Sequence, residues 1–512
     1  MKYKKSLDVL LKEAEETGEG TLRRTLGAGN LIALGIGAII GAGLFVRTAA
    51  AAADHAGPAV TLGFILAAIG CALAGLCYAE FASMIPIAGS AYTYSYATMG
   101  EKVAWIIGWD LVLEYAVGAA TVSIAWSEYL NKLLETMGFS IPYQYCHSPF
   151  QSSAEGVQGL INLPALFIII VLSLVLIRGT KESANLNNFI VILKVAIVII
   201  FIAIGWGFMN PVNHTPYIPD NLGEQQLIAG NKSFLDYFTS DFGKFGWSGI
   251  VSAAGVVFFA FIGFDAVSTA AQEAKNPSKD MPIGILVSLA ICTVLYVLFG
   301  HVLTGVANYK EFAVSGKEAS VAYTIETYMH GYHWLSILVT VAILAGFSSV
   351  ILVMLLGQSR VFFSMSKDGL VPKIFSAIHP KFQTPYKSNL IFMVFVGIFA
   401  AFVPGDIVGD MTSIGTLFAF SLVCIGIIIL RKTDPNRVRP FKTPLMPFVP
   451  ILGALTCLLM MIGLGAENWT RLIVWMAIGF VIYYAYSVKH SKIRNEGKTV
   501  FPKDPPNPTI VE

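Results

Sequence analysis

Long apolar runs separated by short polar stretches dominate the pattern of hydrophobic positions along this chain. About twelve of these runs approach the roughly 20 residues that a helix needs to cross a bilayer. They cover residues 28–53, 58–85, 103–134, 161–178, 187–209, 247–274, 283–306, 333–364, 389–403, 408–430, 447–466 and 469–488. The stretch from 389 to 430 is short for two spans, but Pro404, Gly405 and Asp406 mark a turn within it. The pattern predicts an all-α integral membrane protein with about twelve transmembrane helices.

Composition supports a membrane protein and leaves little room for a soluble domain. Of the 512 residues, 55% are hydrophobic and 13% are charged, whereas about 25% are charged in a soluble domain. Residues 1–24 are polar and lack the apolar core of a signal peptide. We expect polar tails at 1–27 and 489–512.

Several functional classes find no support in the sequence. The six cysteines have neither metal-ligand spacing nor the pattern of a disulfide framework. A glycine-rich nucleotide loop followed by Lys-Ser or Lys-Thr is missing, which disfavours ATP-driven transport. No nucleophile–base arrangement can be assigned. We therefore expect no enzyme activity, no catalytic residues, no cofactor, no metal and no nucleic-acid partner.

Lysine and arginine are distributed unevenly between the two sides of the predicted membrane. With the N-terminus inside, about 26 of these residues fall on the inner side and about seven on the outer side. The positive-inside rule then places both termini in the cytoplasm, which requires an even number of spans. We expect a multi-pass protein of the cell (inner or plasma) membrane.

The first predicted span contains a glycine-rich stretch from Gly35 to Phe45. Glycine is a poor helix former, by about 1 kcal/mol relative to alanine, so Gly41-Ala42-Gly43 predicts a break in mid-span. Broken backbone inside a membrane is tolerated only where protein or a water-filled cavity satisfies its polar groups. The stretch therefore predicts a polar site near the middle of the membrane.

The sixth predicted span has a matching interruption at Gly263, two residues before the intramembrane Asp265. Paired breaks in corresponding positions of two halves are typical of inverted-repeat transporters, although each break alone is equally compatible with helix packing. Helix N–H groups freed after the first break would attract an anion, and freed helix carbonyls would attract a cation. The free N–H groups are predicted at Ala42, Gly43 and Leu44, and the free carbonyls at Ile39, Ile40, Phe259, Ala260 and Ile262. A carboxylate pole beside an ammonium pole fits an α-amino acid.

Several motifs in chain order resemble the amino acid–polyamine–organocation superfamily, and the third span resembles the cationic amino acid transporter family within it. The motifs are Gly35 to Phe45, Gly108 to Tyr115, Phe259 to Asp265, Gln272 to Pro277, Gly357 to Arg360 and Met365 to Pro372. The resemblance implies the leucine-transporter-type fold, in which two inverted five-helix repeats with broken helices 1 and 6 work by alternating access. On this chain the repeats would occupy 28–209 and 247–430, with two extra spans at 447–488.

The resemblance also implies which residues bind substrate. It places the substrate carboxylate at Gly41, Ala42 and Gly43, and the substrate ammonium at the carbonyls of Ile39, Phe259, Ala260 and Ile262. Position 42 is often Ser or Thr in relatives, and Ala42 lacks that hydroxyl but keeps its N–H group.

Lys194 lies within the fifth span, where a lysine costs about 2.5–3.5 kcal/mol. Removal from water favours the neutral amine, so this group could load and release a proton. In proton-coupled relatives a lysine here replaces a bound sodium ion and bridges span one to span eight. There, Ser348 and Ser349 stand where sodium-coupled relatives place hydroxyl ligands. We expect proton coupling through Lys194; the alternative is a structural cation that binds helix carbonyls.

Glu114 and Asp265 are two further charges at membrane depth. The resemblance favours a role in the substrate pocket, where they would receive a cationic side chain or the substrate ammonium. The alternative is pairing with helix ends or with Lys194. Arg47, one turn outward from Gly43, would repel a cationic substrate, but we expect it to extend to the outer surface. Cationic, neutral and broad substrate ranges all stay open.

Other polar residues receive structural interpretations. We expect no partner cluster around His55 or His301. Tyr92, Tyr94 and Tyr96 would form an interface belt. Glu273 and Lys275 would cap a helix end or pair with Arg23 or Arg24 as an inner gate.

The sequence thus predicts a secondary active amino acid transporter that couples symport of L-amino acids to protons. The alternatives are an amino acid exchanger or a non-transporting amino acid receptor. Its partners would be an L-amino acid, the proton and the lipid bilayer, and the protein would be a monomer or a weak homodimer.

Overall fold

The computed structural model describes residues 3–5, 26–85, 90–153, 155–178, 184–222, 244–269, 274–313, 320–382 and 384–496. Within these ranges the protein is nearly all helical, and β-type pairing is limited to two isolated bridges, Leu26 with Ala274 and Ser152 with Gln158. Seven helical segments of this part are long and apolar enough to cross a membrane, and five further apolar helices are shorter. The prediction of an all-α membrane protein is confirmed.

The first half of the chain contains two interrupted rods, several simple helices and short helical turns. The elements are α2 (Ala28–Ile39), η1 (Gly43–Arg47), α3 (Thr48–Ala51), η2 (Ala52–Ala56), η3 (Gly57–Ala59), α4 (Val60–Met84), α5 (Ser90–Thr98), α6 (Glu101–Val112), η4 (Leu113–Val117), α7 (Gly118–Thr136), η5 (Tyr143–Tyr145), α8 (Leu163–Arg178), α9 (Ala184–Gly205), η6 (Trp206–Phe208) and η7 (Pro211–His214). The π-helical turn η4 joins α6 and α7 into one continuous rod.

The second half again begins with an interrupted helix. Its elements are α11 (Gly246–Val257), η9 (Phe258–Phe261), α12 (Ala266–Thr269), α13 (Pro277–Val306), η11 (Glu311–Ala313), α14 (Ser320–Tyr328), α15 (His333–Lys367), η12 (Lys373–Ser376), α16 (Tyr386–Phe402), α17 (Gly405–Thr433), α18 (Phe448–Gly463), α19 (Gly465–Ile482), η13 (Tyr483–Ser487), α20 (Val488–His490) and α21 (Lys492–Glu496). The turn predicted at Pro404 is confirmed, because α16 ends at Phe402 and α17 begins at Gly405.

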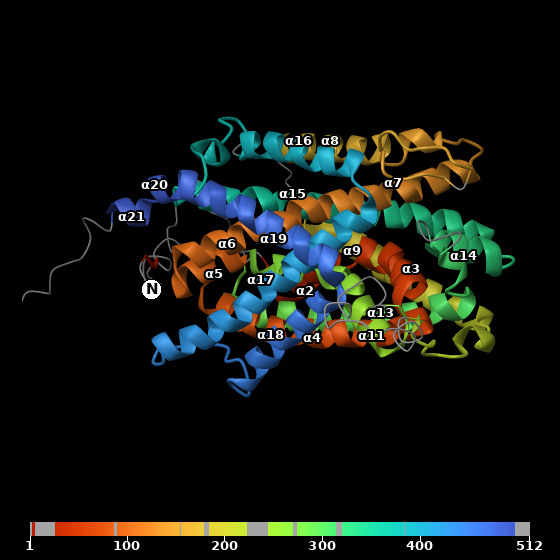
Figure 1. The fold of residues 1–512 in the computed structure, drawn as a ribbon, viewed down its shortest axis with the longest axis horizontal. Coiled ribbons are helices and arrows are strands. Elements are labelled where there is room, and N and C mark those ends of the chain that lie inside the picture. The colour runs from red at the N-terminus through yellow and green to blue at the C-terminus, as the bar shows by residue number, and fades with distance from the viewer. Residues whose placement is uncertain are drawn as a thin grey trace, which may run out of the picture.

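Most long helices run along the longest axis of the molecule (Figure 1). Helices α8 and α16 pack side by side along one long edge, next to α7 and α15. Helices α4, α11 and α18 pack together on the opposite side, and the short helix α2 lies between these groups, against α13 and α9. The segment before the first break is therefore enclosed by longer helices.

Both described ends of the chain lie at the same end of the helical bundle (Figure 1). The N–H group of Glu101 donates a hydrogen bond of 3.0 Å to the carbonyl of Tyr3. Nε of Arg494 in α21 lies 2.6 Å from Oε1 of the same Glu101. Lys5 pairs with Asp368 just after α15, at 3.2 Å. An even number of spans requires this arrangement.

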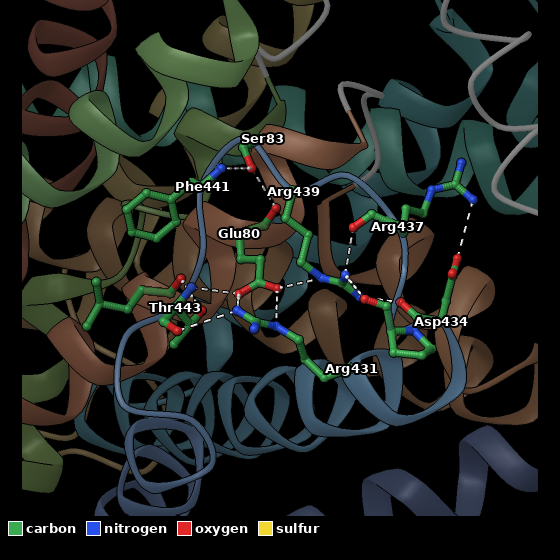
Figure 2. Close-up of polar contacts among 10 residues, drawn as sticks. Glu80, Ser83, Arg431, Asp434, Arg437, Arg439, Phe441 and Thr443 are labelled. Carbon is green, nitrogen blue, oxygen red and sulfur yellow. Dashed lines mark hydrogen bonds and ion pairs between the residues drawn. The ribbon is translucent and has the colours of Figure 1, made fainter.

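A buried carboxylate ties α4 to the chain that follows α17 (Figure 2). Glu80 is fully buried and accepts two hydrogen bonds of 2.7 Å from Arg431, one to each oxygen. Nε of Arg439 lies 3.2 Å from Oε1, and the N–H group of Thr443 donates to Oε2 at 2.7 Å. A buried carboxylate is tolerated when charged donors satisfy it in this way. The clamp fixes the end of α17 against α4.

Two of the structural interpretations are wrong. Tyr92, Tyr94 and Tyr96 do not form an interface belt, because α5 lies inside the bundle and all three side chains are buried. The hydroxyl of Tyr92 donates a hydrogen bond of 2.8 Å to Asp368. His301 does have a partner cluster, since its ring centroid lies 4.6 Å from that of His214. The proposed pairing of Glu273 with Arg23 or Arg24 lies outside the described residues.

Candidate functional site

The first break occupies the two residues after α2. Helix α2 ends at Ile39, and Ile40 is extended, with φ −74° and ψ 104°. Helical structure resumes beyond Gly41, whose carbonyl accepts hydrogen bonds from the N–H groups of Leu44 at 3.2 Å and Phe45 at 3.4 Å. The break therefore falls where the glycines predict it. The N–H group of Leu44 was expected to be free, and that expectation is wrong because the turn closes on Gly41.

The second break follows the 3₁₀ turn η9. Ile262 is extended, with ψ 136°, and Gly263 has φ 111°, a conformation that favours glycine. The carbonyl of Phe259 was expected to be free but accepts a hydrogen bond of 3.3 Å from the N–H group of Ile262. The helical path resumes at α12, just after Asp265.

The two breaks lie against each other. A Cβ atom added to Gly43 would overlap the backbone of Ala260, and one added to Gly263 would lie 2.9 Å from the carbonyl oxygen of Ala38. Glycine at these two positions lets the backbones approach. Seven of the predicted substrate-binding residues therefore lie in one place, namely Ile39, Gly41, Ala42, Gly43, Phe259, Ala260 and Ile262. Their role in binding stays a prediction.

Tyr296 of α13 joins the two breaks. Its hydroxyl oxygen lies 2.9 Å from the carbonyl oxygen of Ile39 and 2.9 Å from that of Ala260. A hydroxyl has one proton, so it donates to one of these carbonyls at a time. Both carbonyls were predicted to be free, and the structure corrects this. In this conformation the tyrosine occupies the acceptors proposed for the substrate ammonium.

A small apolar cavity opens beside the breaks. It is lined by Ala38, Ile262 and Gly263 from the breaks, by Tyr115 of η4, and by a stripe of α15 that includes Val350 and Met354. Apart from the Tyr115 hydroxyl, these side chains are apolar. The cavity offers apolar side-chain contacts immediately next to the two breaks.

The two predicted carboxylates also lie close together. Asp265 accepts a hydrogen bond of 2.6 Å from the hydroxyl of Tyr115. Glu114 is fully buried, and its electrostatic neighbours include Asp265, Asp110 and Thr416. Sequence reasoning found Glu114 and Asp265 but missed Asp110 and Tyr115, although both stand in the same third-span motif.

Lys194 connects three helices. Its Nζ atom donates a hydrogen bond of 2.8 Å to the carbonyl of Gly37 in α2, and the side chain is 2% exposed. On α15, a Cβ atom added to Gly346 would lie 2.8 Å from Cε of Lys194. Ser348 and Ser349 follow two and three residues later, both half-buried, and the Ser348 hydroxyl donates to the carbonyl of Leu344 at 2.9 Å. The lysine thus links α9 to α2 and to α15.

Arg47 does not extend to the outer surface, so that expectation is wrong. The residue is 4% exposed, and its guanidinium pairs with Asp410 and, at 3.4 Å, with Asp406 of α17. Asn468 of α19 donates a hydrogen bond of 3.3 Å to the other oxygen of Asp410. Partners of opposite charge explain why Arg47 turns inward. They also offset the positive charge that would repel a cationic substrate.

The sequence profile of a family described as amino acid permease matches residues 26–483, which include both breaks and Lys194. The chain belongs to the amino acid permease family. The permease is therefore a multi-pass membrane transporter and not an enzyme, and its resemblance to the superfamily named above is confirmed.

Three relatives illustrate the range of this similarity. The permease is 42% identical to the branched-chain amino acid permease BcaP of Bacillus subtilis (strain 168), over 96% of this chain and 98% of the relative. It is 40% identical to the methylthioribose transporter of the same organism, over 95% and 98%. It is 32% identical to the vacuolar cationic amino acid transporter 4 of Arabidopsis thaliana, over 82% and 65%.

Proposed function

We propose that the permease is a proton-coupled symporter of L-amino acids with neutral, apolar side chains, working by alternating access across the cell membrane. In this proposal twelve helices form two inverted repeats, 28–209 and 247–430, with two further helices. The contact between the two helix breaks is the observation that carries the proposal. It gathers helix ends of opposite polarity at one point, next to an apolar cavity.

The breaks can bind both charged groups of an amino acid. The helical turn that starts after Gly41 directs its N–H groups and the positive end of its dipole toward the break, where a carboxylate is favoured. The carbonyls of Ile39 and Ala260 can accept hydrogen bonds from an ammonium group once the Tyr296 hydroxyl yields its place. A carbonyl oxygen has two lone pairs, so it can accept a hydrogen bond from the substrate ammonium while the Tyr296 hydroxyl also donates to it.

Two features support a neutral, apolar substrate side chain. The cavity beside the breaks is lined mainly by aliphatic side chains such as Val350 and Met354, and apolar burial contributes about 25 cal/mol per Å². The relative with 42% identity carries the name branched-chain amino acid permease. The relative named for methylthioribose, at 40% identity, gives the alternative substrate class that a binding test must include.

Lys194 supplies the proton site of this proposal. In its charged form it donates to the Gly37 carbonyl and holds α2 against α9 and α15. Loss of the proton weakens this hydrogen bond, because a charged donor binds a carbonyl more strongly than a neutral one does. The protonation state of Lys194 is thereby coupled to the position of α2, which carries half of the substrate site.

Uptake into proteoliposomes tests the proposal. Labelled leucine, arginine and methylthioribose are compared with and without an inward proton gradient. The proposal predicts that leucine accumulates above equilibrium only when the outside is more acidic. Uptake that does not depend on the proton gradient but requires amino acid inside the proteoliposomes would instead identify an exchanger. Saturable binding without flux would identify a receptor. Accumulation of methylthioribose alone would show that the substrate is methylthioribose and not an amino acid.

A further inference from the structure

Asp110 is a buried carboxyl group in α6 that has no role in the proposed coupling through Lys194. It is 1% exposed, and neither of its oxygens has a hydrogen-bond partner among the described residues. Burying a polar group without a partner is costly, and burying an unpartnered charge costs far more. A residue buried in this way is expected to have either a function or a neighbouring group of opposite charge.

The orientation of α6 fixes the direction in which Asp110 faces. Trp105 and Trp109 donate hydrogen bonds of 3.0 Å and 2.9 Å to the carbonyls of Gly479 and Trp475, and so hold one face of α6 against α19. Asp110 points instead to α17, where a Cβ atom added to Gly415 would lie 3.1 Å from its Oδ1 atom. The carboxyl group therefore faces the protein interior between α6 and α17.

The groups around Asp110 are acids and uncharged residues. Glu114 lies one turn along the same rod, and Asp265 at the second break is the next carboxylate. Tyr92 of α5 and Met365 of α15 lie against Gly108, two residues earlier in α6, and α17 contributes Gly415. No lysine or arginine is among these described neighbours. The charge of an ionised Asp110 would thus be uncompensated.

Other buried polar side chains near this interface also lack partners within the described part of the chain. They include Ser413 of α17 and Gln358 of α15, both fully buried. Gln358 follows Gly357, whose added Cβ atom would lie 3.4 Å from the Tyr115 ring. Asp265, in contrast, accepts a hydrogen bond of 2.6 Å from the Tyr115 hydroxyl.

We infer that Asp110 is a second proton-binding site, which loads its proton from Glu114 and releases it toward the end of the bundle that holds both chain termini. In the closed conformation Asp110 carries a proton, since the ionised form would be buried without a counter-charge. Its position lies nine residues from Glu101, about 13 Å along the helix from the inner end. Water reaching this end would let the carboxyl ionise and would take up its proton. Glu114, one turn away, would then pass its own proton to Asp110 and take a new one from water on the opposite side of the membrane when the site opens there.

The inference rests on the proposed proton coupling and adds one proton to it. Lys194 and Asp110 have different surroundings: Lys194 contacts α2 and α15, whereas Asp110 faces α17. Two separate sites predict that each leucine moves with one proton more than Lys194 alone would carry.

Asp110→Asn isolates this contribution, because the amide keeps the size of the protonated acid and cannot release a proton. In proteoliposomes with the membrane potential clamped, the pH gradient that just halts net leucine flux gives the number of protons per leucine. We expect this number to fall by one in Asp110→Asn and to stay unchanged in the control Asp220→Asn, an exposed outer residue. Leucine exchange at equal pH on both sides, which needs no net proton movement, should persist and would demonstrate that the variant folds.

A second readout does not depend on flux. Infrared difference spectra between neutral and alkaline pH should contain the band of a protonated carboxyl group that is missing in Asp110→Asn. A proton number that Asp110→Asn leaves unchanged, or a wild-type spectrum identical to that of the variant, would overturn the inference alone. A wild-type proton number of zero would overturn the proposed function and this inference with it.

Discussion

The Nζ atom of Lys194 lies 2.8 Å from the carbonyl oxygen of Gly37, three residues before the first helix break opens at Ile40. A titratable group in one helix thus holds the segment that carries half of the proposed substrate site. In the proposed mechanism, this hydrogen bond would connect proton binding at Lys194 to the geometry of that site.

Replacing Lys194 tests this connection. Lys194→Ala should lose the part of the accumulation that the Lys194 proton drives but keep leucine exchange, since the breaks themselves are intact. One pH unit per proton corresponds to about 1.4 kcal/mol, or about tenfold accumulation. Labelled leucine uptake at a one-unit gradient should therefore drop by about tenfold. Full accumulation in Lys194→Ala would remove the lysine from the coupling mechanism.

The close contact between the breaks predicts the effect of a single methyl group. Gly263→Ala combines an unfavourable φ of 111° with a Cβ atom 2.9 Å from the carbonyl of Ala38. Gly465→Ala is the matched control, because Gly465 has φ 83° with open space around it. The control should lose about 1–3 kcal/mol of stability from strain alone and retain uptake. Gly263→Ala should abolish uptake even where the protein still folds; equal uptake by both variants would contradict the assigned contact.

The Tyr296 hydroxyl competes with substrate for the carbonyls of Ile39 and Ala260 in this account. Tyr296→Phe removes a hydrogen bond with a net contribution of about 0.5–1.5 kcal/mol to the closed conformation. Leucine binding, measured by calorimetry or thermal shift, should become about two- to tenfold tighter. Tyr217→Phe is the control, because its hydroxyl bonds Thr61 instead. Weaker binding in Tyr296→Phe would assign the hydroxyl to the substrate itself.

The ion pair between Arg47 and Asp410 predicts strong coupling between two helices. Arg47 is buried, and breaking a buried pair leaves an uncompensated charge. A double-mutant cycle with Arg47→Ala and Asp410→Ala should give an interaction free energy of about 1–3 kcal/mol from thermal or denaturant unfolding. The exposed pair Arg471–Glu467, at 3.2 Å, should give less than about 0.5 kcal/mol. Equal values for the two pairs would mean that Arg47 contributes only as a surface charge.

Local chemistry explains why parts of the site could be predicted from the sequence. The breaks follow from glycines at 41, 43 and 263, because backbone freedom is a property of the residue itself. Lys194 could be singled out because a charge inside an apolar run is costly wherever it points. The poles of the site followed from the direction of the helices alone.

The remaining parts depend on partners far away in the chain. The chain positions of Arg47 and Asp410 differ by 363 residues. The sequence around Arg47 alone does not reveal this partner, so it predicts only that the arginine extends to the surface. The position of Tyr296 differs by 257 residues from that of Ile39, and a tyrosine in an apolar span does not reveal which carbonyl it meets. The tyrosines of α5 were misplaced for the same reason, since their burial is decided by the helices that enclose α5.

The proton dependence of leucine uptake tests the central claim most directly. Purified permease in proteoliposomes is given labelled leucine at equal pH and then with the outside one pH unit more acidic. The account predicts accumulation above equilibrium only in the acidic condition, and its collapse when a protonophore dissipates the gradient. Leucine accumulation that the gradient and the protonophore leave unchanged would contradict proton-coupled transport by this protein.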